Sequence, residues 1–122
     1  DPDVIIVDGH GVAHPAGCGV ATYLGVELGK PCFGVANSLT VGERQENKLL
    51  LNSIVVGKVI KTKEHAKELF VTAGHLITGE TAAHIALTCV VAPHKLPEPL
   101  HIAHRFAEKT RDRIVEEGKV TA

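Results

Sequence analysis

The fold is decided by one stretch near the start of the sequence, VIIVDGHGVAHP at residues 4–15. Its first four residues are continuously apolar, which predicts a strand that is buried on both faces and therefore parallel to its neighbour. Asp8 follows at the carboxyl end of this strand, where α/β sheets place ligands. Residues 9–19 are rich in glycine, so they predict a loop in which several positions can take positive φ. A carboxylate beside a glycine loop is the first candidate for a functional site.

Two further segments complete a β-α-β unit. Residues 20–28 carry Val20, Leu24 and Leu28 at helical spacing, and a glycine directly after them predicts the end of the helix. Residues 32–36, CFGVA, are a short apolar run that predicts a second buried strand. The crossover between two such parallel strands is right-handed. The carboxyl ends of both strands are therefore expected at one edge of the sheet.

The second half of the chain combines strand and helix patterns. Residues 53–62 and 68–73 are rich in β-branched residues and predict an antiparallel hairpin, whereas the polar stretch 40–48 is expected to be a mobile loop. Thr78 is a favourable N-cap for a following helix, and a last helix is predicted over residues 99–117. The first of these helices has the apolar stripe Ala83, Ala86, Leu87 and Val90. The second has the apolar face Leu100, Ala103, Ala107 and Ile114. Together the elements predict an α/β fold with a mixed sheet and flanking helices.

Length and composition limit the class of protein. A chain of 122 residues predicts one compact, soluble domain, here residues 1–122. The net charge is -1 and aromatic residues make up 3% of the chain, so neither a basic coat for DNA nor a platform for stacked bases is expected. The printed sequence does not open on a positively charged, apolar segment and has no apolar run near ~18 residues, so we expect a cytoplasmic protein without a membrane partner. The three cysteines lack metal-site spacing and are interpreted as small buried hydrophobic residues.

Several polar residues could carry chemistry. Asp8 could hold a divalent cation beside a phosphate, or it could cap the loop by accepting backbone N–H groups. His75 lies between a strand and a helix N-terminus, where histidine can act as acid, base or phosphate contact, although the pattern alone favours a plain loop histidine. His101 and His104 stand at i, i+3 on the last helix, where a solvated face is favoured over a shared metal. The histidines of residues 9–19 are flanked by glycine and proline, which excludes a two-histidine helical zinc motif.

Several segments together resemble one nuclease family. VDGHGVAHP at residues 7–15, GVA at 19–21 and 34–36, LFVTAGH at 69–75 and LPEP at 96–99 occur in the order found in endonuclease V. The resemblance covers almost the whole chain and corresponds to the C-terminal half of the family's ribonuclease-H-like fold. It implies a Mg²⁺- or Mn²⁺-dependent nuclease of DNA repair. Such an enzyme recognises deoxyinosine or inosine in DNA or RNA and cleaves the strand on its 3′ side.

The resemblance also implies roles for individual residues. Asp8 matches the family's metal-binding aspartate and His75 its active-site histidine, so these two are the expected catalytic residues. A flipped hypoxanthine would be recognised by backbone groups and by the shape of a pocket. The residues expected to contact substrate are Gly9, His10, Gly11, His14, Gly19, Val20, Ala36, Asn37 and Gly74.

The sequence departs from the family pattern at several points. The resemblance implies further catalytic carboxylates upstream of the VDGHG strand, in a region that would precede Asp1. Asn37 stands where the family has a lysine, Ala16 and Gly17 replace a basic pair, and Leu76 replaces an arginine. We therefore expect impaired or partner-dependent cleavage. A catalytically inactive inosine- or nucleic-acid-binding module and an oligomerisation domain are the alternatives.

The last expectation concerns assembly. In the implied fold the strand at residues 4–7 is interior, and its partner strand would precede Asp1. Without that partner, backbone N–H and C=O groups would stay unpaired along an apolar edge. We expect the edge to be covered in a homo-oligomer or by a separate N-terminal half.

Overall fold

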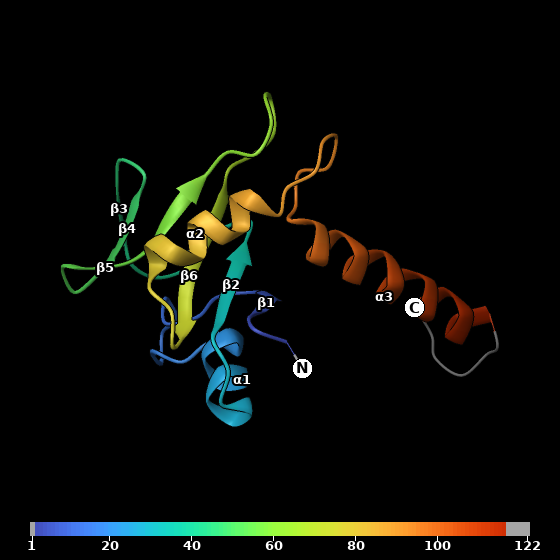
Figure 1. Ribbon diagram of the computed structural model, residues 1–122, viewed down its shortest axis with the longest axis horizontal. Helices are drawn as coiled ribbons and strands as arrows, with labels where there is room; N and C mark the ends of the chain where they lie inside the picture. The colour runs from blue at the N-terminus through green and yellow to red at the C-terminus, as the bar shows by residue number, and fades with distance from the viewer. Residues whose placement is uncertain (1, 117–122) are drawn as a thin grey trace.

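A six-stranded mixed sheet forms the centre of the structure (Figure 1). The computed structural model describes residues 2–116. The strands lie in the order β1-β2-β6-β5-β4-β3, in which β1 (Ile5–Asp8) and β2 (Cys32–Ala36) are parallel and the other neighbours are antiparallel. The predicted α/β fold with a mixed sheet is therefore confirmed. Among the described residues, no helix combines the length and the apolar character needed to cross a membrane.

Helix α1 (Val20–Leu28) connects β1 and β2 as predicted, and the glycine after it takes φ 64° and ends it. The predicted apolar face is wrong, however. Val20 and Leu28 are 54% and 56% exposed, and the helix buries Ala21 and Gly25 instead. A side chain on Gly25 would overlap side chains of the sheet. Small residues are therefore what allow α1 to lie close to the strands.

The predicted antiparallel hairpin is confirmed as β5 (Ile54–Ile60) and β6 (Leu69–His75). Two strands, β3 (Glu43–Gln45) and β4 (Lys48–Leu51), form a further hairpin, where the sequence predicted only a mobile loop followed by an unassigned stretch. All three residues of β3 are exposed, and they read ERQ. No apolar alternation marks such a strand in the sequence.

Helix α2 (Gly79–Thr88) covers one face of the sheet and closes the main hydrophobic core (Figure 1). Thr78 is its N-cap, as predicted, because its hydroxyl accepts a hydrogen bond of 3.1 Å from the Thr81 N–H. Three alanines of α2 pack against side chains from β2, β5 and β6, whereas Leu87 of the predicted stripe is 48% exposed. The buried residues of this core are Phe33, Val35, Ile60, Leu69, Val71, Ala82, Ala83, Ala86 and Leu100.

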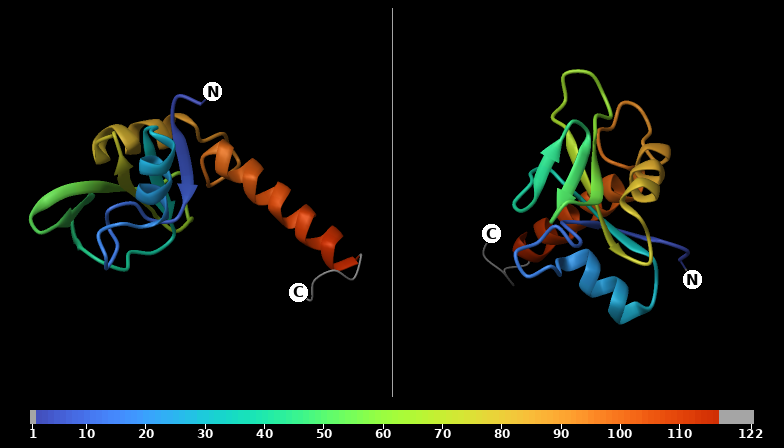
Figure 2. Two further views of the ribbon diagram at one scale, coloured as in Figure 1. Left: turned by 90° about the horizontal axis from the view of Figure 1, so that it is seen from below. Right: turned by 90° about the vertical axis from the view of Figure 1, so that its left-hand side faces the viewer.

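Helix α3 (Glu98–Glu116) projects from the body of the molecule, and its far end lies well away from the sheet (Figures 1 and 2). Leu100 anchors its first turn in the core and is 4% exposed. Ala103 and Ala107 are exposed and Ile114 is half-buried, so the predicted apolar face is correct at Leu100 alone. Residue 117, the last of the predicted helix, lies outside the described residues.

Candidate active site

Asp8 lies at the carboxyl end of β1, with its side chain 55% exposed. His104 of α3 reaches it, and its Nε2 is 2.9 Å from Oδ2 of Asp8. Val4 and Ile6 pack against the main core, and side chains alternate along a strand. Asp8 therefore projects to the same face, beside which the start of α3 lies. A carboxylate and an imidazole from remote parts of the sequence thus meet at one point.

His75 lies at the other end of the sheet. The register pairs Asp8 with Val35, but it pairs His75 with Cys32, three residues earlier on β2. At ~3.3 Å per residue and ~4.8 Å between strands, the Cα atoms of Asp8 and His75 are about 14 Å apart. His75 packs under α1, where a side chain on Gly25 would overlap it. The structure therefore does not bring the two predicted catalytic residues together.

His104 is the candidate that the sequence pattern left aside. The available signal was its i, i+3 spacing from His101, which favoured a solvated helix face for both. In the structure, His101 stacks on His94 with ring centroids 3.5 Å apart, whereas His104 contacts Asp8. The difference depends on how the first turns of α3 dock beside β1. Helical spacing does not contain that information.

The glycine loop after Asp8 lies directly on the sheet. Gly11 donates its N–H to Oγ1 of the buried Thr72 at 2.9 Å. A Cβ on Gly34 would overlap the Gly9 carbonyl, so the loop can cross β2 only because Gly34 has no side chain. The motif is thus fixed to β2 and β6, and its shape is largely preformed.

The far end of the loop closes back on its start. Gly19 donates its N–H to the Gly11 carbonyl at 2.9 Å, and Ala21 donates to the His10 carbonyl at 3.2 Å. These bonds hold the beginning of α1 against the residues that follow β1. Five of the predicted substrate residues lie in this loop, and Val20 begins α1 directly after it: the five are Gly9, His10, Gly11, His14 and Gly19.

Two histidines contribute to the shape of the loop. Nε2 of His10 is 2.6 Å from the Ser38 carbonyl. Nδ1 of the same ring is buried and has no hydrogen-bond partner among the described residues. Nδ1 of His14 accepts the Ala16 N–H at 3.1 Å. Through these two rings the loop is tied to the Ser38 backbone and to its own backbone.

The remaining predicted substrate residues divide between the two ends of the sheet. Ala36 ends β2 on the Asp8 side, and Asn37 follows it. Oδ1 of Asn37 accepts a hydrogen bond of 3.3 Å from Nζ of Lys95, which lies in the connection between α2 and α3. Gly74 lies at the opposite end, where a Cβ would crowd the backbone of α1. The structure thus joins Ala36 and Asn37, but not Gly74, to the edge that carries Asp8.

Asp8 and His104 are side chains of the types that can ligate a metal ion, and they meet at this edge. The residues from 2 to 116 contain no group of three or more histidine, cysteine, aspartate and glutamate side chains that could hold a metal ion. One carboxylate and one imidazole are therefore the protein ligands that the described chain offers there.

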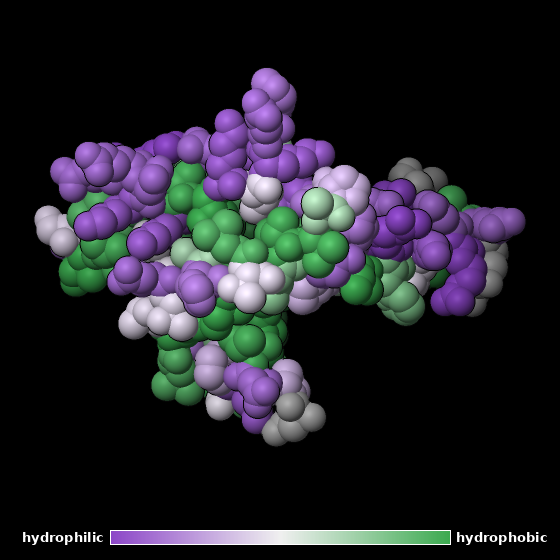
Figure 3. Space-filling view, turned by 45° about the horizontal axis from the view of Figure 1, so that its top comes forward, coloured by the Kyte–Doolittle hydropathy of each residue, from purple (hydrophilic) through white to green (hydrophobic). Residues whose placement is uncertain are grey.

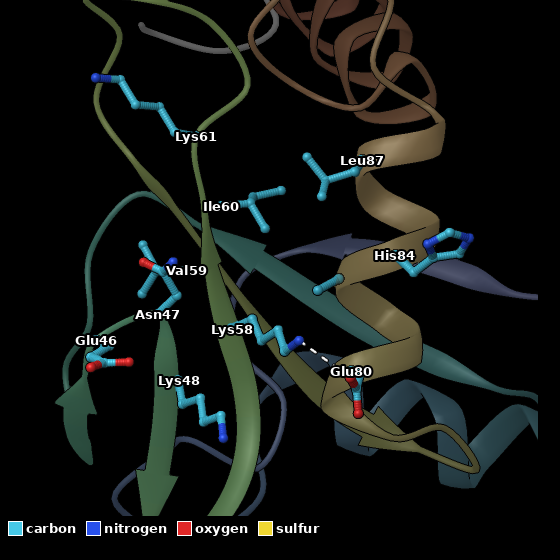
Figure 4. A pocket seen from close by; sticks show the side chains of 11 residues that line it. Glu46, Asn47, Lys48, Lys58, Val59, Ile60, Lys61, Glu80, His84 and Leu87 are labelled. Atoms are coloured by element: carbon cyan, nitrogen blue, oxygen red, sulfur yellow. Dashed lines mark hydrogen bonds and ion pairs between the residues drawn. The ribbon is translucent and has the colours of Figure 1, made fainter.

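A hollow of about 580 Å³ lies elsewhere, between α2 and the β4–β5 hairpin. It is lined by Lys48, Lys58, Glu80 and His84 among others (Figure 4), and Nζ of Lys58 is 3.4 Å from Oε1 of Glu80. The residues predicted from the sequence to bind substrate do not line it. This hollow is therefore separate from the Asp8 edge.

The cysteines differ in environment. Cys32 on β2 is buried, and burial raises the pKa of its thiol, an effect that a hydrogen bond with the Gly25 backbone partly offsets. Cys89 is half-buried, whereas Cys18 in the glycine loop is exposed. The prediction that all three are buried hydrophobic residues is therefore wrong for Cys18.

Comparison with known proteins identifies relatives of this chain. The model of the endonuclease V family matches residues 1–105. The endonuclease V of Thermofilum pendens is 42% identical over 112 residues, and that of Geotalea uraniireducens is 41% identical over 122 residues. The alignments cover 88% and 93% of this chain but 48% and 52% of the relatives. The chain therefore spans about half the length of the curated relatives it matches.

Solved structures share the fold. The catalytic domain of human endonuclease V matches with a TM-score of 0.80 and 28% identity, over 98% of this chain and 55% of that one. The endonuclease V of Ciona intestinalis was solved in complex with a DNA containing an inosine followed by a ribo-adenosine. It matches with a TM-score of 0.79 and 29% identity, over 93% of this chain and 56% of that one.

Proposed function

The chain belongs to the endonuclease V family, and we propose that it supplies the Asp8–His104 part of a metal-dependent site that cleaves nucleic acid containing deoxyinosine or inosine. The observation that carries the proposal is the 2.9 Å contact of Asp8 with His104, at the end of the strand that leads into the glycine loop. The inosine-containing DNA bound by the Ciona relative supports this class of substrate. Repair of deaminated bases is the corresponding role.

A divalent cation fits these two side chains as part of its ligand set. Asp8 offers the carboxylate oxygen that Mg²⁺ and Mn²⁺ prefer, and imidazole is a ligand of many transition metals. When bound, such an ion would lower the pKa of a water molecule and offset charge on the phosphate. Mn²⁺ suits the mixed pair better than Mg²⁺, because Mg²⁺ is bound mainly by oxygen.

The side chains of this chain have separate tasks in the proposed reaction. Asp8 accepts a hydrogen bond and provides negative charge at the carboxyl edge. His104, held 2.9 Å away, can carry a proton at Nε2 or release it. The glycine loop offers backbone groups to a flipped base, because its glycines place no side chains in the way. The unsatisfied Nδ1 of His10 is a further polar group at this loop.

We expect the chain by itself to cleave weakly or not at all. Two-metal phosphoryl transfer uses several carboxylates, whereas one carboxylate and one histidine meet at the Asp8 edge. Carboxylates from a separate N-terminal half or from another subunit would complete the site. Inosine binding without cleavage is the second candidate, and the preformed glycine loop favours it because the loop is held by the described residues themselves.

A cleavage assay tests the proposal. Oligonucleotides with one deoxyinosine or inosine are incubated with Mg²⁺ or Mn²⁺, with the chain alone and with an N-terminal fragment of a relative. Little cleavage by the chain alone, and more with the fragment, is expected, and Asp8→Ala should abolish it. Cleavage that persists in Asp8→Ala would contradict the proposal. Inosine-selective binding with no cleavage under any metal would favour the binding module.

A further inference from the structure

A second hollow lies at the same edge of the sheet as Asp8. It has a volume of about 440 Å³ and is found where β2 ends and the turn between β5 and β6 projects. Hydrophilic residues gather over this projecting turn (Figure 3). The hollow is lined by Asn37, Lys61, Ala66, Lys67, Glu68 and Phe70.

The charge at this hollow is positive. Its one carboxylate, Glu68, is held by Arg44 through two hydrogen bonds of 2.7 and 2.8 Å, which lower the pKa of Glu68. That carboxylate is therefore ionised and already paired. Lys61 and Lys67 are both exposed at the rim. The net charge of the whole chain is -1, so a surplus of ammonium groups here is a local feature.

Lys95 does not line the hollow, but it brings a third ammonium group to Asn37 from a different part of the chain. Its Nζ donates to the amide oxygen of Asn37 at 3.3 Å. An amide fixes the position of the ammonium but does not neutralise its charge. The amide nitrogen of Asn37 remains a donor that could bind an anion at the same point.

Asn37 and Asp8 lie close together and on one face. Asp8 pairs with Val35 of β2. Asn37 comes two residues after Val35, directly past the end of the strand. At ~3.3 Å per residue and ~4.8 Å between strands, the two Cα atoms are about 8 Å apart. Val35 belongs to the main core, so Asn37 projects to the face on which Asp8 lies. One nucleic-acid strand could therefore touch both residues.

We propose that Lys95, positioned by Asn37, binds a backbone phosphate of the nucleic-acid strand beside the bond at Asp8, and that Lys61 and Lys67 extend this phosphate track toward β5. The inference rests on the proposed function, which places the nucleic-acid strand at Asp8. It assigns substrate contacts to residues outside the glycine loop and the Asp8–His104 pair. The bound group is a phosphodiester, recognised by charge and without base contacts.

Salt-dependent binding tests the track. Affinity for single-stranded oligonucleotides, with and without deoxyinosine, is measured over a range of salt concentrations in EDTA, so that no cleavage occurs. Each phosphate contact contributes about 0.7 to the slope of log affinity against log salt for single strands. Lys95→Gln should lower that slope by about 0.7 and weaken binding of both oligonucleotides equally. Lys95→Arg keeps the charge and should retain the slope.

Lys48→Gln is the matched control. Lys48 is exposed and lies four strand spacings from Asp8, about 19 Å at ~4.8 Å each. The Lys48→Gln substitution removes the same charge far from the proposed track, so it should leave the slope of log affinity against log salt unchanged. An equal loss in Lys48→Gln and Lys95→Gln would overturn the proposal, as would an unchanged slope in Lys95→Gln.

The same data separate this inference from the proposed function. A lowered slope in Lys95→Gln without any preference for deoxyinosine would support the phosphate track and count against inosine recognition. A preference for deoxyinosine together with an unchanged slope would support the proposed function and overturn the track. No measurable binding of either oligonucleotide at low salt would overturn the track as well.

Discussion

A carboxylate and an imidazole in contact can share a proton or bind a cation together. The proton and the cation compete for the same lone pairs. Metal ligation requires an ionised carboxylate and a neutral imidazole, so the proposed metal binding at Asp8 and His104 should weaken at low pH. The contact of 2.9 Å in the described structure shows that both groups are already directed at one point. Little rearrangement is then needed for them to act as a pair.

The first prediction distinguishes the two histidines. His104→Ala should weaken Mn²⁺ binding by at least about tenfold, because it removes one of the two donors at Asp8. His75→Ala should leave the affinity unchanged, since the sheet register places His75 at the other end of β2. Water-proton relaxation measures Mn²⁺ affinity without any substrate. Equal losses in both variants would rule out the assignment.

The second prediction concerns thiol reactivity. The thiolate is the reactive form, and burial raises the pKa of Cys32, so less thiolate is present at a given pH. Cys18 is exposed, and it should react with iodoacetamide first. Labelling followed by mass spectrometry should place the first adduct on Cys18 and an adduct on Cys32 only after denaturation. Early modification of Cys32 in the folded protein would contradict the buried position of β2.

At the scale of elements, the packing of the glycine loop on β2 gives the third prediction. Gly34→Ala should destabilise the fold by about 3 kcal/mol, the upper end of overpacking effects, because the obstacle is the Gly9 carbonyl and not a flexible side chain. Gly17→Ala is the control, since its Cβ would meet open space and its φ of 73° costs about 1 kcal/mol. Urea denaturation measures both. A smaller loss in Gly34→Ala than in Gly17→Ala would contradict the close crossing.

The elements that the sequence predicts well are those with a strong local signal. The apolar runs of β1 and β2, the glycine that ends α1 and the hydroxyl of Thr78 each act within a few residues. The buried faces of α1 and α3 were predicted poorly, because contact with the sheet depends on partners that are distant in sequence. α1 meets the sheet through Ala21 and Gly25, whose small size gives no apolar stripe.

The site was predictable in part for the same reason. The glycine loop and Asp8 form one continuous motif, and the structure keeps their parts together. His75 belonged to a recognisable string, but the antiparallel direction of β6 carries it away from Asp8. His104 and Lys95 reach the edge from the α2–α3 connection and α3. Their positions depend on how α3 and the α2–α3 connection pack against the sheet, and no single segment of the sequence specifies that packing.

At the scale of the whole molecule, β1 lies at one edge of the described sheet. Ile5 donates its N–H to the Pro31 carbonyl and Gly9 donates its N–H to the Val35 carbonyl, so the N–H of Ile6, between them, points outward. An apolar hollow of about 440 Å³ lines this edge, between β1 and the start of α3. Unpaired strand edges of this kind favour association with another strand.

The fourth prediction is that the 122-residue chain forms at least a dimer at micromolar concentration, with β1 at the interface. Ile6→Pro should shift the protein toward the monomer, because proline removes the outward donor. Ile6→Ala is the control, since it trims the packing of Ile6 on the core but keeps the N–H. Sedimentation velocity measures the assembly. A well-folded monomer of the unmodified chain would refute the prediction.

The contact between Asp8 and His104 spans 96 positions of the chain, and this has a consequence for the timing of biosynthesis. While the protein emerges from the ribosome, the glycine loop can pack on β2 and β6 before α3 is outside the ribosome, because α3 follows both strands in the chain. The pair at Asp8 closes only after the helix has left the exit tunnel and Leu100 has been seated. Contacts of such long range form late in folding. An incomplete nascent chain would therefore hold a shaped loop without the Asp8–His104 pair.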